Sequence, residues 1–270
     1  MKRKILALTA AAIMALSCFA LAGCGGGGDD SASNESDLAY VQDKGTLVVG
    51  ITDFAPMDYK DDNGEWIGFD ADLSRAYAES IGVDIEFIEI NWDSKEMELE
   101  NKNIDCVWNG MTLTDGVKKA METSNAYCNN AQVVVVSADK ADSIKSPEDC
   151  ADLSFVVEAG SAGEEVANDN GFNVMAVETQ ADAVMEVAAG TADACIIDSL
   201  MAGAMVGEGT SYENLAATIG LNEELYGVGF RKGSDMAASL NEFFKAAYAD
   251  GTIMEIAEKY GTQESIIEQK

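Results

Sequence analysis

Histidine is absent from this sequence, and the absence excludes a Ser-His-Asp triad and a histidine-ligated metal site. Basic residues are few, because 17 Lys and Arg stand against 48 Asp and Glu, for a formal net charge of −31. Such an acidic chain lacks the basic face with which proteins bind nucleic acid or anionic lipid. The six cysteines form no CxxC pair, so their spacing gives no metal-binding pattern. We therefore expect no nucleic-acid partner, no metal and no cofactor.

The N-terminal residues predict a secretory signal. Lys2-Arg3-Lys4 precedes an uncharged apolar run over residues 5–20, which is short for a membrane span. Leu21-Ala22-Gly23-Cys24 follows at once and resembles the lipobox of bacterial lipoproteins. The resemblance implies cleavage of residues 1–23 and a lipid on Cys24 that anchors the protein to the cell membrane, outside the cytoplasm. The alternative is an ordinary secretory signal with a free cysteine. Residues 24–37, rich in Gly, Ser and acids, are expected to form a flexible tether.

Residues 105–115 predict the position of a binding site. An apolar strand ends there in small polar residues, with a turn at Gly110 and a helix start at Thr114 and Asp115. In an open α/β sheet, ligands bind beyond the carboxyl ends of the strands. A helix N-terminus beside such an end favours an anion, for example a carboxylate. We therefore expect a crevice here, with the rest of the chain as its walls and hinge.

Apolar strands alternate with helices along the remaining chain. One helix is expected to open at Asp70, which fits an N-cap, and to end at Gly82. Because the rhythm restarts after residue 130 with its own strands, we expect an α/β fold of two lobes, each a doubly wound sheet. Two helices, over residues 234–249 and 252–260, close the chain. The other strands are expected at residues 46–51, 83–90, 131–136, 153–157, 174–177, 194–198 and 226–230, with a hairpin over 59–68.

Several short motifs, taken in order, resemble the amino-acid-binding proteins of ABC importers, the bacterial solute-binding family 3. They include Gly68-Phe69-Asp70-Ala71-Asp72-Leu73, Asn103-Ile104-Asp105, Gly190-Thr191-Ala192-Asp193-Ala194, Gly229-Phe230-Arg231-Lys232-Gly233 and Lys259-Tyr260-Gly261. The resemblance covers residues 46–261 and implies a type II periplasmic-binding-protein-like fold, hinged by two crossing strands. It places lobe 1 at residues 38–130 plus 228–270 and lobe 2 at residues 131–227. Closure about the hinge would trap a ligand between the lobes.

The same resemblance implies nine ligand-binding positions. Phe54 and Trp92 would pack against the ligand, because aromatic rings bury apolar area and can face a cation; a core aromatic is the alternative for each. Ser161 and Ala162, at a helix start, would hold a ligand carboxylate. Asp198 would take the α-ammonium group, with an ordinary strand-end acid as the alternative. Gly110 and Thr112 would offer a backbone carbonyl and a backbone N–H. The full set is Asp53, Phe54, Trp92, Asn109, Gly110, Thr112, Ser161, Ala162 and Asp198.

The sequence departs from the family pattern at one position. The family has an Arg three residues after the Thr that matches Thr114, and this Arg forks onto the ligand carboxylate. Here the position is Val117, which is no substitute for a planar bidentate donor. Three alternatives follow: Lys118 or Lys119 reaches in after a register shift, N–H groups alone hold the carboxylate, or the ligand has no α-carboxylate.

The sequence therefore predicts a binding protein, not an enzyme. We expect a monomeric, lipid-anchored protein that binds a polar amino acid or related solute and delivers it to the permease of an ABC importer by hinge closure. One alternative is an enzyme on the same fold, resembling the periplasmic dehydratases, with Glu158 and Asp198 as candidate carboxylates for proton transfer. Another alternative is a ligand-sensing domain with a separate partner. Cys106, Cys150 and Cys195 are expected to be buried small hydrophobes, not disulfide partners.

Overall fold

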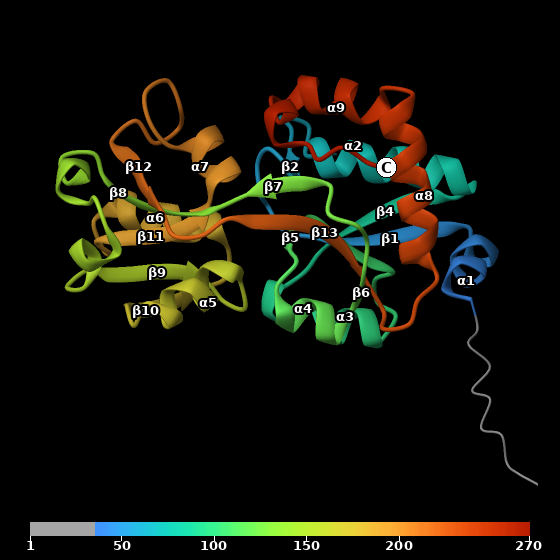
Figure 1. The fold of residues 1–270 in the computed structure, drawn as a ribbon, viewed down its shortest axis with the longest axis horizontal. Coiled ribbons are helices and arrows are strands. Elements are labelled where there is room, and N and C mark those ends of the chain that lie inside the picture. The colour runs from blue at the N-terminus through green and yellow to red at the C-terminus, as the bar shows by residue number, and fades with distance from the viewer. Residues whose placement is uncertain (1–35) are drawn as a thin grey trace, which may run out of the picture. The chain divides into compact units, whose positions relative to one another are not determined.

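A computed structural model describes residues 36–270, which carry two large β-sheets (Figure 1). A third, two-stranded sheet is the predicted hairpin, formed by the antiparallel strands β2 (Tyr59–Lys60) and β3 (Trp66–Ile67). The first sheet has the strand order β4-β1-β5-β13-β6, and β7 pairs with β13. Strand β1 is parallel to β4 and β5, whereas β13 is antiparallel to β5. The strands are β1 (Thr46–Ile51), β4 (Asp84–Glu89), β5 (Cys106–Thr112), β6 (Glu122–Thr123), β7 (Cys128–Asn130) and β13 (Glu224–Phe230).

Helices cover both faces of this first sheet (Figure 1). Helices α2 (Phe69–Ile81), α8 (Met236–Ala249) and α9 (Thr252–Tyr260) lie on one side, and α3 (Lys95–Glu100) and α4 (Asp115–Ala120) lie on the other. Since both faces are covered, β1 and β5 are buried almost throughout and lack a polar alternation. Trp108 of β5 points into this core, where it packs edge-on against Phe244 of α8.

The second sheet has the order β10-β9-β11-β8-β12. Alternate residues of β11 face opposite layers: Cys195 and Ile197 belong to the cluster that contains α6 residues, while Ala194 and Ile196 pack with Ala167 of α5. The strands are β8 (Gln132–Ser137), β9 (Ser154–Glu158), β10 (Asn173–Val177), β11 (Ala194–Asp198) and β12 (Leu215–Gly220). The helices are α5 (Ala162–Asp169), α6 (Gln180–Ala189) and α7 (Ser199–Met205), with 3₁₀ turns η2 (Ala141–Ser143) and η3 (Pro147–Cys150).

The chain crosses between the sheets twice. It leaves β7 of the first sheet and enters β8 of the second after Ala131, and it returns from β12 into β13 at Glu224. Two mixed α/β sheets joined by two crossing segments confirm the predicted fold class, a type II binding-protein-like fold of two lobes. We call the parts built on the first and second sheets lobe 1 and lobe 2. Strand β13 enters lobe 1 at Glu224, while the lobe boundaries predicted from the sequence remain predictions.

The predicted N-cap at Asp70 is wrong. Helix α2 begins at Phe69, with Gly68 as the cap residue at φ 131°. A Cβ on Gly68 would lie 2.1 Å from the carbonyl oxygen of Met57, so this close approach requires glycine. Asp70 is instead fully buried in the first turn, where its carboxylate accepts hydrogen bonds from the N–H of Gly110 and the hydroxyl of Tyr127, both at 2.7 Å.

The predicted turn at Gly110 is also wrong. Strand β5 runs through Gly110 to Thr112, and Thr114 then caps α4 by accepting a hydrogen bond from the N–H of Val117. Gly110 has φ 55° inside the strand, and the pairing with β13 shifts register between Val107 and Met111, the segment that contains Gly110. The irregularity is therefore a bulge-like feature within the strand and does not reverse the chain.

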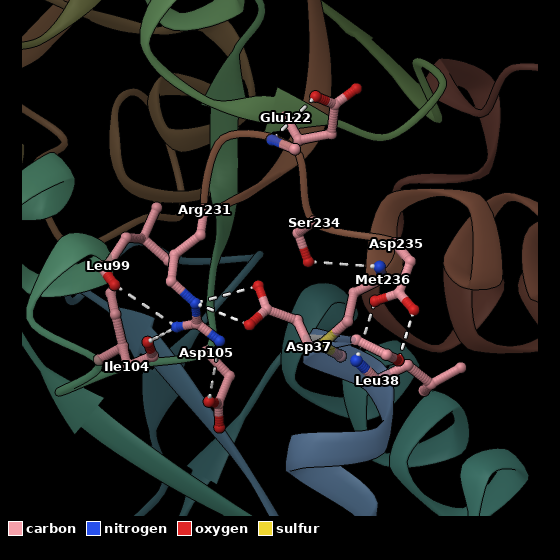
Figure 2. A network of polar contacts seen from close by, with 12 residues as sticks. Asp37, Leu38, Leu99, Ile104, Asp105, Glu122, Arg231, Ser234, Asp235 and Met236 are labelled. Carbon is pink, nitrogen blue, oxygen red and sulfur yellow. Dashed lines mark hydrogen bonds and ion pairs between the residues drawn. The ribbon is translucent and has the colours of Figure 1, made fainter. Parts of the chain in front are cut away.

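Helix α1 (Asp37–Lys44) was not predicted, and its N-cap is Ser36. Figure 2 shows how polar contacts fasten it to lobe 1. The Arg231 guanidinium donates to the Asp37 carboxylate at 3.0 Å and to the carbonyl oxygen of Ile104 at 2.9 Å, and it lies 3.6 Å from Asp105. Ser36 and the N–H of Leu38 donate to Asp235. The last two residues of the expected tether, Ser36 and Asp37, therefore belong to the start of this helix.

The four cysteines of the described part, Cys106, Cys128, Cys150 and Cys195, are all buried and free. The prediction that three of them are buried is confirmed. Burial raises the pKa of each of these thiols, so they behave as small apolar core groups.

Candidate functional site

A cleft lies where loops of the two lobes meet, and we call it the interlobe cleft. Its cavity volume is about 60 Å³, and the cavity is partly open to solvent. Its walls come from the ends of β1, β5, β9 and β11 and from the starts of α3, α4, α5, α6 and the 3₁₀ helix η1 (Trp92–Ser94). The lining residues are Thr52, Phe54, Trp92, Lys95, Asn109, Gly110, Met111, Thr112, Thr114, Val117, Glu158, Gly160, Ser161, Ala162, Glu165, Gln180 and Asp198.

The structure brings eight of the nine predicted ligand-binding residues together in this cleft. Asp53 is the exception, because its side chain is exposed and it does not line the cleft. Val117 lines the cleft as well, whereas Lys118 and Lys119 are exposed and lie outside it. The eight that line it are Phe54, Trp92, Asn109, Gly110, Thr112, Ser161, Ala162 and Asp198.

Two aromatic side chains form part of the lobe 1 wall. Phe54 is nearly buried and meets Tyr226 edge-on, with ring centroids 6.3 Å apart. Trp92 lies in the 3₁₀ helix η1 (Trp92–Ser94), whose N-cap Asn91 accepts a hydrogen bond from the N–H of Asp93. Both rings are held by packing, so they offer fixed apolar surfaces to a ligand.

The end of β5 contributes polar groups that are largely engaged by the protein itself. Asn109 Oδ1 accepts from the N–H and the hydroxyl of Thr52, and its amide nitrogen donates to the Thr52 carbonyl and to Asp58. The side chain of Asn109 therefore positions β1 beside β5. The N–H of Gly110 donates to Asp70, and the hydroxyl of Thr112 donates to Glu224 at 2.9 Å.

Helix α5 presents its N-terminus to the cleft from lobe 2. Ser161 is the N-cap, and its hydroxyl accepts from the N–H of Glu164 at 3.1 Å. The Glu164 carboxylate in turn accepts from the N–H of Gly160 at 2.7 Å. The first helical residues, Ala162 and Gly163, have no acceptor for their N–H groups within the helix. These groups and the helix dipole favour an anion at this point.

Asp198, at the end of β11, is the centre of a buried hydrogen-bond network. Its Oδ1 accepts from Asn130, from Gln132 at 3.0 Å and from the hydroxyl of Tyr226 at 2.6 Å, and its Oδ2 accepts from Gln180. Burial raises the pKa of Asp198 to about 7, and the charge of Glu224 adds to the increase. A ligand cation would offset this cost, because an opposite charge favours the ionised carboxylate.

Sequence reasoning did not place Lys95 or Gln180 in the site, and it named Glu158 only as a candidate for proton transfer. Lys95 follows Trp92 by three residues, which is the spacing of neighbours on a helical turn and was a usable signal. Glu158 ends β9 just as Asp198 ends β11, so both lie at carboxyl ends of strands. Burial raises the pKa of Glu158 to about 8; Asp198 adds to the increase and Lys95 opposes it.

The predicted signal peptide and the predicted lipid on Cys24 are not tested by the structure. Cys24 and the signal lie outside residues 36–270. Within the described range, the helices are too short or too polar to cross a membrane. The same range has no cluster of acidic or cysteine side chains suited to a metal ion.

Comparison with known proteins assigns the chain to a family. Residues 47–263 match the model of the bacterial extracellular solute-binding proteins, family 3. The chain is 31% identical over 268 residues to the L-cystine-binding protein TcyA of Bacillus subtilis, with 96% of this chain and 97% of TcyA covered.

Solved structures agree with this match. The ancestral amino acid-binding protein AncCDT-1, a precursor of cyclohexadienyl dehydratase, is 33% identical with a TM-score of 0.76, covering 83% of this chain and 99% of that one. An ABC uptake transporter substrate-binding protein from Streptococcus pneumoniae with bound histidine is 28% identical with a TM-score of 0.76, covering 84% and 96%. The chain belongs to the bacterial extracellular solute-binding proteins, family 3.

Proposed function

We propose that the protein is the extracytoplasmic solute-binding protein of an ABC importer and that it binds a polar amino acid or a related small solute in the interlobe cleft. The observation on which this proposal rests is that one side of the cleft favours a negative group and the other side favours a positive group. The N-terminus of α5 favours an anion, while Asp198 favours a cation. An amino-acid backbone supplies one group of each sign.

Each part of the ligand has a counterpart in the cleft. The carboxylate would lie against Ser161 and Ala162, and the α-ammonium group against Asp198 Oδ2, which accepts one hydrogen bond in the structure. Phe54 and Trp92 would flank the side chain, since both rings line the same cleft. The cystine-binding and histidine-binding relatives support an amino acid as the ligand class.

Delivery follows from the two-lobe architecture. The two crossing segments before β8 and before β13 are the connections about which the lobes can open and close around a ligand. The closed, loaded protein would dock on the permease as a monomer. The lipid on Cys24 and the tether that follows it would keep the domain at the outer face of the cell membrane.

Thermal unfolding of the protein against a panel of amino acids, polyamines and dipeptides tests the proposal. A ligand at a hundred times its dissociation constant adds about 2.7 kcal/mol to the free energy of unfolding. We expect one amino acid or a few related ones to raise the unfolding temperature, and the others to leave it unchanged. A panel without any stabilising compound would contradict the proposal.

A second candidate function is an enzyme on the same fold. Glu158 and Asp198 have pKa values raised to about 8 and about 7 inside the cleft, as general acids often do. The similarity to a precursor of a dehydratase points the same way. Incubation of the stabilising compound with the protein, followed by mass analysis of the compound, separates the two: a binding protein returns it unchanged.

A further inference from the structure

Lys95 is the cationic side chain of the interlobe cleft. In the part of the chain that the structure describes, the other charged residues that line the cleft are acidic, namely Glu158, Glu165 and Asp198. Lys95 is only 8% exposed, and lysine is seldom buried without a charged partner. Its position in an otherwise acidic cleft therefore needs an explanation.

The hydrogen bonds of Lys95 leave its charge uncompensated. Its Nζ donates to the carbonyl oxygen of Gly160 at 2.9 Å and to that of Trp92 at 3.2 Å, and it lies 4.9 Å from the Trp92 ring centroid. Both hydrogen-bond acceptors are neutral, and an ammonium group has three donors, so one N–H remains. Within residues 36–270, no carboxylate oxygen lies within 4.0 Å of this nitrogen.

Glu158 does not cancel this charge. It is buried in the same cleft, and its Oε1 has no hydrogen-bond partner among the described residues. Because its pKa is raised to about 8, it is mostly protonated at neutral pH. Burial lowers the pKa of Lys95, and the carboxyl groups of Glu158, Glu96 and Asp93 oppose this decrease. An anion in contact with Nζ would raise the pKa further.

The Lys95 ammonium lies beside the anion-favouring end of α5. The bond to the Gly160 carbonyl holds it next to Ser161 and Ala162, the N-cap and first residue of that helix. Lys95 belongs to lobe 1 and Gly160 to lobe 2, so this hydrogen bond joins the lobes across the cleft. A small anion here would meet the free N–H groups of the helix and one ammonium at the same time.

We propose that Lys95 binds the carboxylate of the ligand and makes the cleft selective for amino acids over the corresponding amines. This inference rests on the proposed function and names the residue that supplies the positive charge. Loss of one charge-assisted hydrogen bond at such a site weakens binding about 10- to 100-fold. A ligand without a carboxylate has no such bond to lose.

Isothermal titration of the full chain tests the proposal with matched pairs of probes. The pairs are L-histidine and histamine, L-arginine and agmatine, and L-cystine and cystamine. Lys95→Met removes the charge and keeps an unbranched apolar chain, while Lys118→Met makes the same change at an exposed lysine outside the cleft. We expect Lys95→Met to raise the dissociation constant of the amino acid that binds wild type about 10- to 100-fold. The dissociation constant of the corresponding amine should not change. Lys118→Met should change neither.

Two results would overturn the inference. One is equal weakening of the acid and its amine in Lys95→Met, which would make Lys95 a contact between lobes only. The other is unchanged binding of the acid, which leaves the amino-acid-binding function standing without this role. If Lys95→Met does not fold, Lys95→Arg is the second variant. It keeps the positive charge, so it should still bind the amino acid more tightly than the amine. Loss of this preference, with the amine still bound, would also overturn the inference. Wild type that binds none of the amino acids would contradict the proposed function itself.

Discussion

At the scale of single residues, Asp105 is the buried charge on which the polar cluster of lobe 1 depends. Its carboxylate accepts from Lys44 at 2.6 Å and from the N–H of Val48 at 2.8 Å, and the Arg231 guanidinium lies 3.6 Å away. Asp105→Ala would leave two cations facing each other without their shared anion. We expect it to lower the free energy of unfolding by about 3–5 kcal/mol, measured by urea denaturation.

An exposed ion pair provides the control for that measurement. Lys60 and Glu89 lie 2.9 Å apart, with side chains 47% and 52% exposed. Glu89→Ala should cost no more than about 1 kcal/mol, because solvent screens such pairs. If Asp105→Ala cost as little as Glu89→Ala, the stabilising role of the buried cluster would be refuted.

Glu158 predicts how stability depends on pH. Its pKa is raised to about 8 in the folded protein, so between roughly pH 4.5 and pH 8 the folded state binds a proton that the unfolded state has released. This group therefore destabilises the fold progressively as pH rises through that window. Glu158→Gln removes this effect. The free energy of unfolding of the variant minus that of wild type should therefore increase by on the order of 3 kcal/mol from pH 5 to pH 8. Denaturation series at both pH values measure this; a constant difference would contradict it.

At the scale of elements, the loop between β9 and α5 must approach lobe 1 closely. Gly160 has φ 69°, and a Cβ there would lie 2.9 Å from the Cα of Asp93 across the cleft. Gly160→Ala should therefore hold the lobes apart and lower ligand affinity at least about tenfold, as measured by titration with the amino acid that stabilises wild type most. A separation of the loops would also break the bond from Lys95 to Gly160.

Gly171, just after α5, is the matched control for that substitution. It has φ 71°, and a Cβ there would meet nothing within 4 Å. Gly171→Ala carries the same backbone cost of about 1–2 kcal/mol without a contact across the cleft. We expect it to lower stability and leave ligand affinity unchanged. Equal losses of affinity in both variants would show that backbone strain, not the approach of the lobes, is responsible.

Elements with strong local signals were predictable from the sequence. Strand β1 coincides with the expected residues 46–51, and α9 spans Thr252–Tyr260, as expected for residues 252–260. The failures have tertiary causes. Asp70 is a favoured N-cap residue type, but the backbone of Met57 lies so close to the actual N-cap position, Gly68, that only a residue without Cβ fits there. Gly110 suggests a turn, yet pairing with β13 carries β5 through it.

The site could be predicted only in part, for the same reason. Strand ends and helix starts mark Asp198 and Ser161 in the sequence, and the family resemblance supplies their roles. The partnership of Lys95 with Gly160 joins positions 65 residues apart, which no local pattern encodes. Polar groups such as those of Asn109 look available in the sequence, but the folded chain uses them to join β1 to β5.

At the scale of the whole molecule, the proposed site of membrane attachment is separate from the domain that carries the interlobe cleft. The residues proposed to anchor the chain precede the described domain, and the cleft is complete within residues 36–270. Removal of the anchor should therefore change where the protein is found and leave its ligand affinity unchanged. This separation leads to a test in the cell.

Cys24→Ala removes the thiol that we propose carries the lipid. Each buried methylene of an acyl chain contributes about 0.8 kcal/mol to membrane attachment, so the wild type should sediment with membranes and Cys24→Ala should not. Cys18→Ala is the control, since Cys18 lies in the apolar run ahead of the expected cleavage point and should leave the protein in the membrane fraction. Fractionation followed by immunoblotting measures this. A Cys24→Ala protein that stays with the membranes through a detergent-free wash would mean that uncleaved signal, not lipid, attaches the chain.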